Sequence, residues 1–173
     1  MLPNPLPPRF TARLAVSVRS VIQHPILKGG RQRVDAGPLE VRAEVDREAG
    51  TVRITEFPTV SDRVATKLGK IQASVELVGQ PQGSFDDATG HISVASELHI
   101  APKSMLARDS DVSMTLASDD RVETPEVSAE GDPLDDGDDV LRLVGEGSFR
   151  GGTLAGGTFW LVLDGTVTGV EAR

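Results

Sequence analysis

Glu56 is the residue whose type and position most suggest chemistry. It follows Val52 and Ile54 at a spacing of two, so in a β-strand its carboxylate would fall on an otherwise apolar face. Burial there would raise the pKa of the carboxyl group and suit it to general acid or base catalysis. Alternatively the strand has already ended, because Phe57 and Pro58 follow and proline biases its predecessor towards a turn. We predict Glu56 as the catalytic residue if the protein is an enzyme.

Three apolar side chains are the candidates for contact with a ligand. Trp160 is the only tryptophan and stands within the apolar run 159–163, where it could floor a cavity or cap its mouth. Simple core packing is the alternative for this side chain. Met114 and Phe57 are the other two residues that we expect to line a ligand cavity.

The histidines do not suggest a metal centre. His91 and His99 lie eight residues apart on one predicted strand, hence roughly 26 Å apart and too far to share a metal. Their face also holds Ser93 and Glu97, so we expect it to face solvent, with a Glu97–His99 polar pair as the alternative.

Most of the negative charge lies in one segment. Residues 119–139 hold ten acids and a single base, Arg121, which leaves the rest of the chain near neutral. Aligning Gly137 with the glycine of an EF-hand loop puts Leu134 and Leu143 at positions that need oxygen ligands, so that calcium motif fails. We expect a solvated loop, with a looser calcium site or a lid over a barrel mouth as alternatives.

Composition excludes several classes of function. The chain has no cysteine, no apolar run near the ~18 residues of a membrane span, and no basic stripe with aromatic residues. We therefore expect no cofactor, no metal, no nucleic-acid partner and no membrane partner, in a cytoplasmic protein for which a homodimer is left open. Four prolines among residues 1–8 predict an extended arm over 1–10, followed by a single domain over 11–173.

Alternating apolar and polar residues dominate that domain and predict β-strands. Residues 39–45 and 51–55 form a predicted hairpin about the loop 46–50. One exception is the segment 61–69, whose N-cap serine and terminal glycine predict a short helix. Further strands are expected over the ranges 13–19, 71–77, 91–100, 112–116, 140–144 and 158–167, with a weaker candidate over 26–34. Successive hairpins favour an all-β fold, a single antiparallel barrel of about eight strands with one short helix; a β-sandwich is the alternative.

A glycine-rich run late in the chain carries a resemblance. Gly145, Gly147, Phe149 and Gly151, followed by a glycine pair at 156–157, resemble the late motif of allene oxide cyclase-like and dirigent-like β-barrels, although Leu154 stands where the next glycine of those families would be expected. The resemblance implies a calycin-like eight-stranded barrel with a ligand cavity, and cofactor-free cyclisation or isomerisation of an apolar substrate.

These observations lead to one predicted function and two alternatives. We predict a barrel that binds an apolar small molecule and acts as a cofactor-independent cyclase or isomerase. A composition rich in alanine, arginine, glycine and valine but poor in lysine suggests bacterial natural-product metabolism as its setting. A non-catalytic ligand-binding barrel is the first alternative. A structural or interaction domain without a cavity is the second.

Overall fold

The protein is described by a computed structural model over residues 6–118 and 140–173. The described chain consists of antiparallel strands and one short 3₁₀ turn, η1. In chain order the elements are β1 (Arg9–Gln23), η1 (Lys28–Gly30), β2 (Arg31–Asp46), β3 (Thr51–Glu56), β4 (Val60–Thr66), β5 (Gly69–Leu77), β6 (Gln82–Phe85), β7 (Ile92–Pro102), β8 (Ser110–Ala117), β9 (Val140–Arg150) and β10 (Thr158–Ala172).

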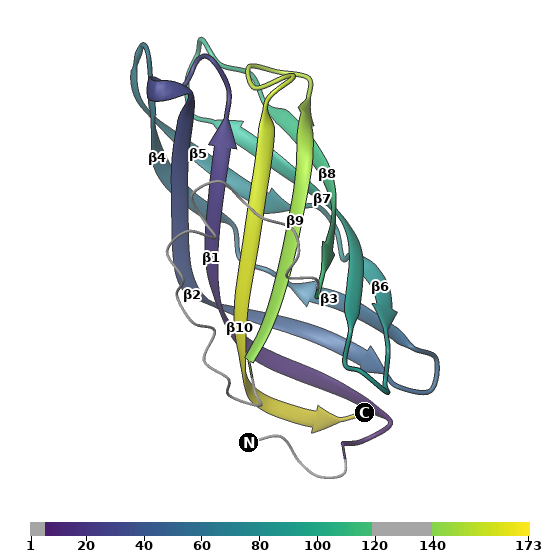
Figure 1. Ribbon diagram of the computed structural model, residues 1–173. Helices are drawn as coiled ribbons and strands as arrows, with labels where there is room; N and C mark the ends of the chain where they lie inside the picture. The colour runs from purple at the N-terminus through teal and green to yellow at the C-terminus, as the bar shows by residue number, and fades with distance from the viewer. Residues whose placement is uncertain (1–5, 119–139) are drawn as a thin grey trace.

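Eight of these strands close into a barrel, as the sequence predicted. Their order around the ring is β1-β2-β3-β6-β7-β8-β9-β10, and the pairing of β10 with β1 completes it. β4 and β5 lie outside the ring as a hairpin, in which β5 pairs with the half of β7 that β6 leaves unpaired (Figure 1). Every strand of the ring has a partner on both sides over at least part of its length, which reduces the exposed edges that favour aggregation.

Strict alternation along β1 shows how the sequence places the core. Phe10, Leu14 and Val18 are buried, whereas Arg13 and Ser17 between them are exposed. Successive side chains of a strand point to opposite faces, so the even-numbered residues of β1 fill the barrel and the odd-numbered ones face outwards. The same alternation on the other strands builds one continuous apolar core inside the ring.

The predicted helix over residues 61–69 is wrong, because this segment forms β4, a tight turn and the start of β5. Thr66 closes the turn, since its hydroxyl donates to the carbonyl of Gly69 at 2.7 Å and accepts from the amide of Leu68 at 3.1 Å. Gly69 has φ of +120°, so the glycine expected to end a helix instead serves a hairpin. Two helical turns are marginal alone, whereas β4 forms a continuous antiparallel ladder with residues 69–75 of β5, and β5 in turn pairs with β7.

The predicted hairpin over 39–45 and 51–55 is confirmed, with Val45 opposite Val52. The short strand β6 was not predicted. It pairs with β3 on one side and with residues 92–94 of β7 on the other, so it joins β3 to β7 within the ring. Within the described residues, no helix is long and apolar enough to span a bilayer.

The glycines of β9 allow close packing against β8. A Cβ added at Gly145 would lie 2.8 Å from the sulfur of Met114, and one added at Gly147 would lie 2.5 Å from the backbone oxygen of Ser113. Ordinary van der Waals contacts to a Cβ start near 3.4 Å. The glycine run therefore has a structural role, as expected of glycines at barrel corners.

Candidate ligand-binding site

An apolar pocket opens at the barrel end that carries the β2–β3 and β6–β7 loops. Its volume is about 460 Å³, within the usual range for small-molecule sites. We call it the Arg47 pocket. Its lining consists mainly of interior-facing side chains of β1, β2, β3, β7 and β10, with loop residues at the rim: Leu6, Phe10, Ala12, Leu14, Ala43, Val45, Arg47, Val52, Phe85, Asp87, Thr89, Gly90, Ile92, Leu141, Val167 and Val170.

Two alanines provide part of the space. Ala12 of β1 and Ala43 of β2 are direct cross-strand partners, and both line the Arg47 pocket. Cross-strand partners on one face stand about 5 Å apart at Cβ, so two methyl groups here leave room that two larger side chains would occupy. Neighbouring interior positions carry Leu14, Val41 and Val45, which confines the gap to this one level of the barrel.

A smaller pocket of about 60 Å³ lies deeper in the barrel, and we call it the inner pocket. It shares five lining residues with the Arg47 pocket: Leu14, Ala43, Val52, Ile92 and Leu141. Its remaining lining is uncharged and almost wholly apolar: Val16, Val41, Ile54, Phe57, Val94, Leu143, Leu163 and Gly165. The two pockets therefore adjoin, and their linings form one apolar region from the barrel mouth towards its middle.

Among the residues that the structure describes, Arg47 and Asp87 provide the only charges that line these two pockets. The Arg47 guanidinium donates from Nε to Oδ1 of Asp87 at 2.6 Å and from Nη2 to Oδ2 at 3.3 Å. It also donates from Nη1 to the backbone oxygen of Leu6. The hydrogen bond and charge of Asp87 raise the pKa of Arg47 above its usual value. Arg47 thus stays charged and joins the β2–β3 loop, the β6–β7 loop and the segment before β1.

Asp46 shapes the loop that presents Arg47. Its carboxylate accepts a hydrogen bond from the amide of Ala49 at 2.9 Å and pairs with Arg9 at 3.2 Å. The amide of Ala49 and then the charge of Arg9 hold the pKa of Asp46 below its ordinary value. Gly50 completes the turn with φ of +68°. Local contacts within the protein therefore order this loop, without the help of a ligand.

Glu56 does not reach the barrel interior. Arg42 pairs with Glu56 and Ala43 with Ile54, so β3 carries one extra residue, Thr55, at this point. Such a bulge reverses the inside–outside alternation of the residues beyond it. The Glu56 side chain is 63% exposed and its carboxylate lies 3.5 Å from Nε of Arg42. The burial on which its predicted acid–base role depended is absent.

The three predicted ligand contacts lie in different places. Phe57 lines the inner pocket. Met114 is buried inside the barrel, over Gly145, and lines neither pocket. Trp160 alternates with the interior residues Phe159 and Leu161, so it points outwards and belongs to a separate buried cluster with Val21, Val144 and Val162.

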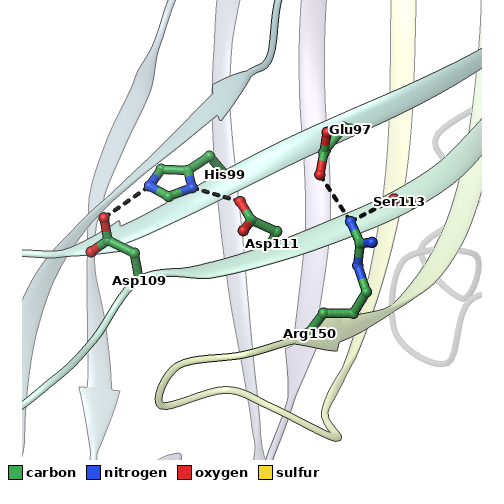
Figure 2. A network of polar contacts seen from close by, with 6 residues as sticks. All are labelled: Glu97, His99, Asp109, Asp111, Ser113 and Arg150. Carbon is green, nitrogen blue, oxygen red and sulfur yellow. Dashed lines mark hydrogen bonds and ion pairs between the residues drawn. The ribbon is translucent and has the colours of Figure 1, made fainter.

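A polar network lies on the outer face of β7, β8 and β9 (Figure 2). Nδ1 of His99 is 2.6 Å from Oδ1 of Asp111, and Nε2 is 2.8 Å from Oδ2 of Asp109. Hydrogen bonds to both carboxylates raise the pKa of His99, Asp111 having the larger effect. The expected solvent-side position of His99 is confirmed by its exposure, but its partners are these aspartates.

The alternative Glu97–His99 pair does not form. Glu97 instead accepts a hydrogen bond from Nη2 of Arg150 at 2.8 Å. The same nitrogen donates to the hydroxyl of Ser113 at 2.9 Å, so the contact joins β7, β8 and β9. Both ring nitrogens of His99 point at carboxylates, and no hydroxyl contacts the ring within the network. The arrangement therefore ties neighbouring strands together, and it does not resemble a nucleophile–base pair.

Comparison of the chain with models of protein families, with curated proteins and with solved structures finds no match. The resemblance of the glycine-rich run to allene oxide cyclase-like and dirigent-like barrels therefore stays a prediction. The acidic segment, with its calcium and lid alternatives, lies outside the described residues, as do residues 1–5 of the predicted proline-rich arm.

Sequence reasoning missed the residues that form the pocket. Ala12 and Ala43 were visible as small residues at alternating apolar positions, but their pairing depends on the register of β1 against β2. Arg47 and Asp87 lie 40 residues apart in two different loops, and the pairing of β3 with β6 brings these loops together. Loop polarity alone gives no such signal, because charged residues are common in hairpin turns.

Proposed function

We propose that the protein binds an apolar small molecule in the Arg47 pocket and the inner pocket. The observation that carries the proposal is a pair of adjoining apolar pockets in the barrel, whose described lining holds one charged pair, Arg47–Asp87, at the mouth. Ligand sites typically combine an apolar lining with a few polar groups that fix orientation. An amphiphile with an apolar body and an anionic end matches this lining best, because the guanidinium can donate hydrogen bonds to a ligand carboxylate in place of Asp87.

Fluorescence titration with the neutral apolar dye N-phenyl-1-naphthylamine tests the apolar part of the proposal. Ala43→Leu adds an isopropyl group at the level where Ala12 and Ala43 leave space, and we expect it to weaken dye binding about tenfold or more, equivalent to about 1.4 kcal/mol. Ala95→Leu is the matched control, since Ala95 is exposed on the outside of β7. Circular dichroism and thermal melting establish that both variants fold. Absence of saturable dye binding, or equal binding by Ala43→Leu, would refute the proposal.

Competition by a fatty acid and by the corresponding alcohol tests the role of Arg47. We expect Arg47→Gln to weaken displacement of the dye by the acid and to leave displacement by the alcohol unchanged, because only the acid loses an ionic partner. A comparable loss for both competitors would assign Arg47 to loop structure alone.

Catalysis is the second candidate, with the reaction being cyclisation or isomerisation of the bound molecule. Its support is the apolar lining of the Arg47 pocket, whose volume of about 460 Å³ could hold the reacting ends of a flexible chain near each other. Glu56 lies outside these pockets, so Glu56→Gln should leave any such conversion of a linear polyene unchanged. Ala43→Leu should abolish it. Identical product mixtures with and without the protein would refute the proposal of catalysis.

A further inference from the structure

The barrel end opposite the Arg47 pocket gathers exposed apolar side chains. The described residues contain four large hydrophobic side chains that are exposed, and three lie at this end: Leu68 at 76%, Met105 at 103% and Leu106 at 86%. Leu68 occupies the tip of the β4–β5 hairpin, and the other two lie in the β7–β8 loop. Leu68 and Leu106 line one apolar pocket of about 180 Å³, so the two tips are neighbours in space.

The same end carries every lysine of the chain. Lys67 and Lys70 flank Leu68, Lys103 precedes Met105, and Lys28 lies in the β1–β2 loop. All four side chains are exposed, as is Arg108 beyond Leu106. The acid within these tips is Asp109, which is held by Nε2 of His99 at 2.8 Å. In a chain of net charge −8, this end is locally cationic.

Hydrogen bonds join the connections at this end in two pairs. The amide of Lys67 donates to the carbonyl of Ile26 at 2.9 Å, and Leu27 forms a bridge with Thr66, so the β1–β2 loop and the β4–β5 turn are joined. The amide of Arg108 donates to the hydroxyl of Thr153 at 2.7 Å, which ties the β7–β8 loop to the β9–β10 loop. In Figure 1 these four connections lie together at the end of the barrel away from the termini.

We propose that this lysine end, formed by residues 24–30, 66–70 and 103–109, docks on the surface of a bilayer that contains anionic lipids. Exposed apolar tips can enter the headgroup region while neighbouring lysines extend their ammonium groups towards lipid phosphates. A protein partner fits less well, because protein interfaces are depleted of lysine and enriched in aromatic residues, and these tips hold four lysines and no aromatic residue. The proposal is independent of ligand binding at the opposite end. It departs from the expectation of no membrane partner, since the fold gathers lysines that the sequence scatters over 28–103.

Co-sedimentation with vesicles of phosphatidylcholine, with and without phosphatidylglycerol, tests the proposal. We expect the protein to bind only the vesicles that contain phosphatidylglycerol. Each lysine near an anionic surface changes partitioning about fivefold, so replacing Lys28, Lys67 and Lys103 by glutamine should weaken binding on the order of 100-fold. The variant Leu68→Ser/Leu106→Ser should also lose binding, because it keeps the charge but removes the inserted side chains.

The matched control is Arg9→Gln/Arg13→Gln/Arg53→Gln. It changes the net charge by the same amount, at exposed side chains of β1 and β3. We expect this variant to bind anionic vesicles like the unmodified protein, and circular dichroism checks that all variants fold. An absence of vesicle binding, or equal losses in the lysine and arginine variants, would overturn the proposal. It would also be overturned if sedimentation equilibrium showed self-association abolished by Leu68→Ser/Leu106→Ser while no vesicle is bound, an outcome that assigns the surface to a protein partner.

Discussion

Replacing Gly147 by alanine tests how closely β9 must pack against β8. The added Cβ would lie 2.5 Å from the backbone oxygen of Ser113 and 2.6 Å from Cγ2 of Val112. A backbone oxygen cannot turn aside as a side chain can, so the strands must separate by several tenths of an ångström or more. Overpacking of this kind destabilises the folded state by about 1–3 kcal/mol. Alanine also lowers the conformational entropy of the unfolded chain, which offsets about 0.4–1 kcal/mol of this loss. We expect a net destabilisation of about 1–2 kcal/mol.

Gly165→Ala is the control for this substitution. It makes the same chemical change on an interior strand face, but its Cβ would meet the flexible ends of Leu14 at 3.3 Å and Val16 at 3.5 Å. Neither glycine has a left-handed φ, so backbone strain does not separate the two variants. Differential scanning calorimetry should show a melting temperature about 2–8 °C lower for Gly147→Ala and nearly unchanged for Gly165→Ala. Equal melting temperatures would refute the argument that Gly147 is required by close packing.

Two further predictions concern ion pairs outside the barrel core. The raised pKa of His99 means that its ion pairs stabilise the folded state below the unfolded-state pKa of about 6.5 and that this contribution is lost as the pH rises through the folded-state pKa. His99→Gln should therefore destabilise by up to about 1 kcal/mol at about pH 5 and less at about pH 9 in urea unfolding; an equal loss at both pH values would contradict this. Asp164 accepts from Nη2 of Arg19 at 2.7 Å and Nε of Arg142 at 2.9 Å, all three side chains being mostly buried. Asp164→Asn should cost about 2 kcal/mol by the same assay, and the exposed control Glu76→Gln almost nothing; similar effects of the two would argue against a stabilising role for this contact.

The barrel was predictable because its strands obey a period of two almost without interruption. Alternation along β1 and across the β2–β3 hairpin is visible in the sequence and is confirmed by burial and register. The misplaced helix shows the limit of local signals, since an N-cap serine and a glycine suit the ends of a helix and of a hairpin equally. The segment pairs with β5, and β5 is anchored to the ring by β7, a strand far along the chain that the local signals do not include.

The pocket was less predictable because it depends on register and on loops. One extra residue at Thr55 reverses the direction of Glu56, and no pattern in the sequence marks that bulge. Trp160 lies among five consecutive apolar residues, so alternation could not say which of them face inwards. Only the neighbouring strands β1 and β9, with their own clear patterns, fix the direction of each side chain.

The strand β1 is paired along most of its length with β2 on one side and β10 on the other. A ribosome delivers β1 and β2 early, whereas β10 follows only after the rest of the ring has been made. Until then one edge of this 15-residue strand has no hydrogen-bond partner, and its apolar face has no strands on the opposite side of the barrel to pack against. Folding must therefore wait for contacts between distant parts of the chain, which is slow and exposes intermediates to aggregation. A growing chain of this protein is an expected client for chaperones that shield strand edges during synthesis.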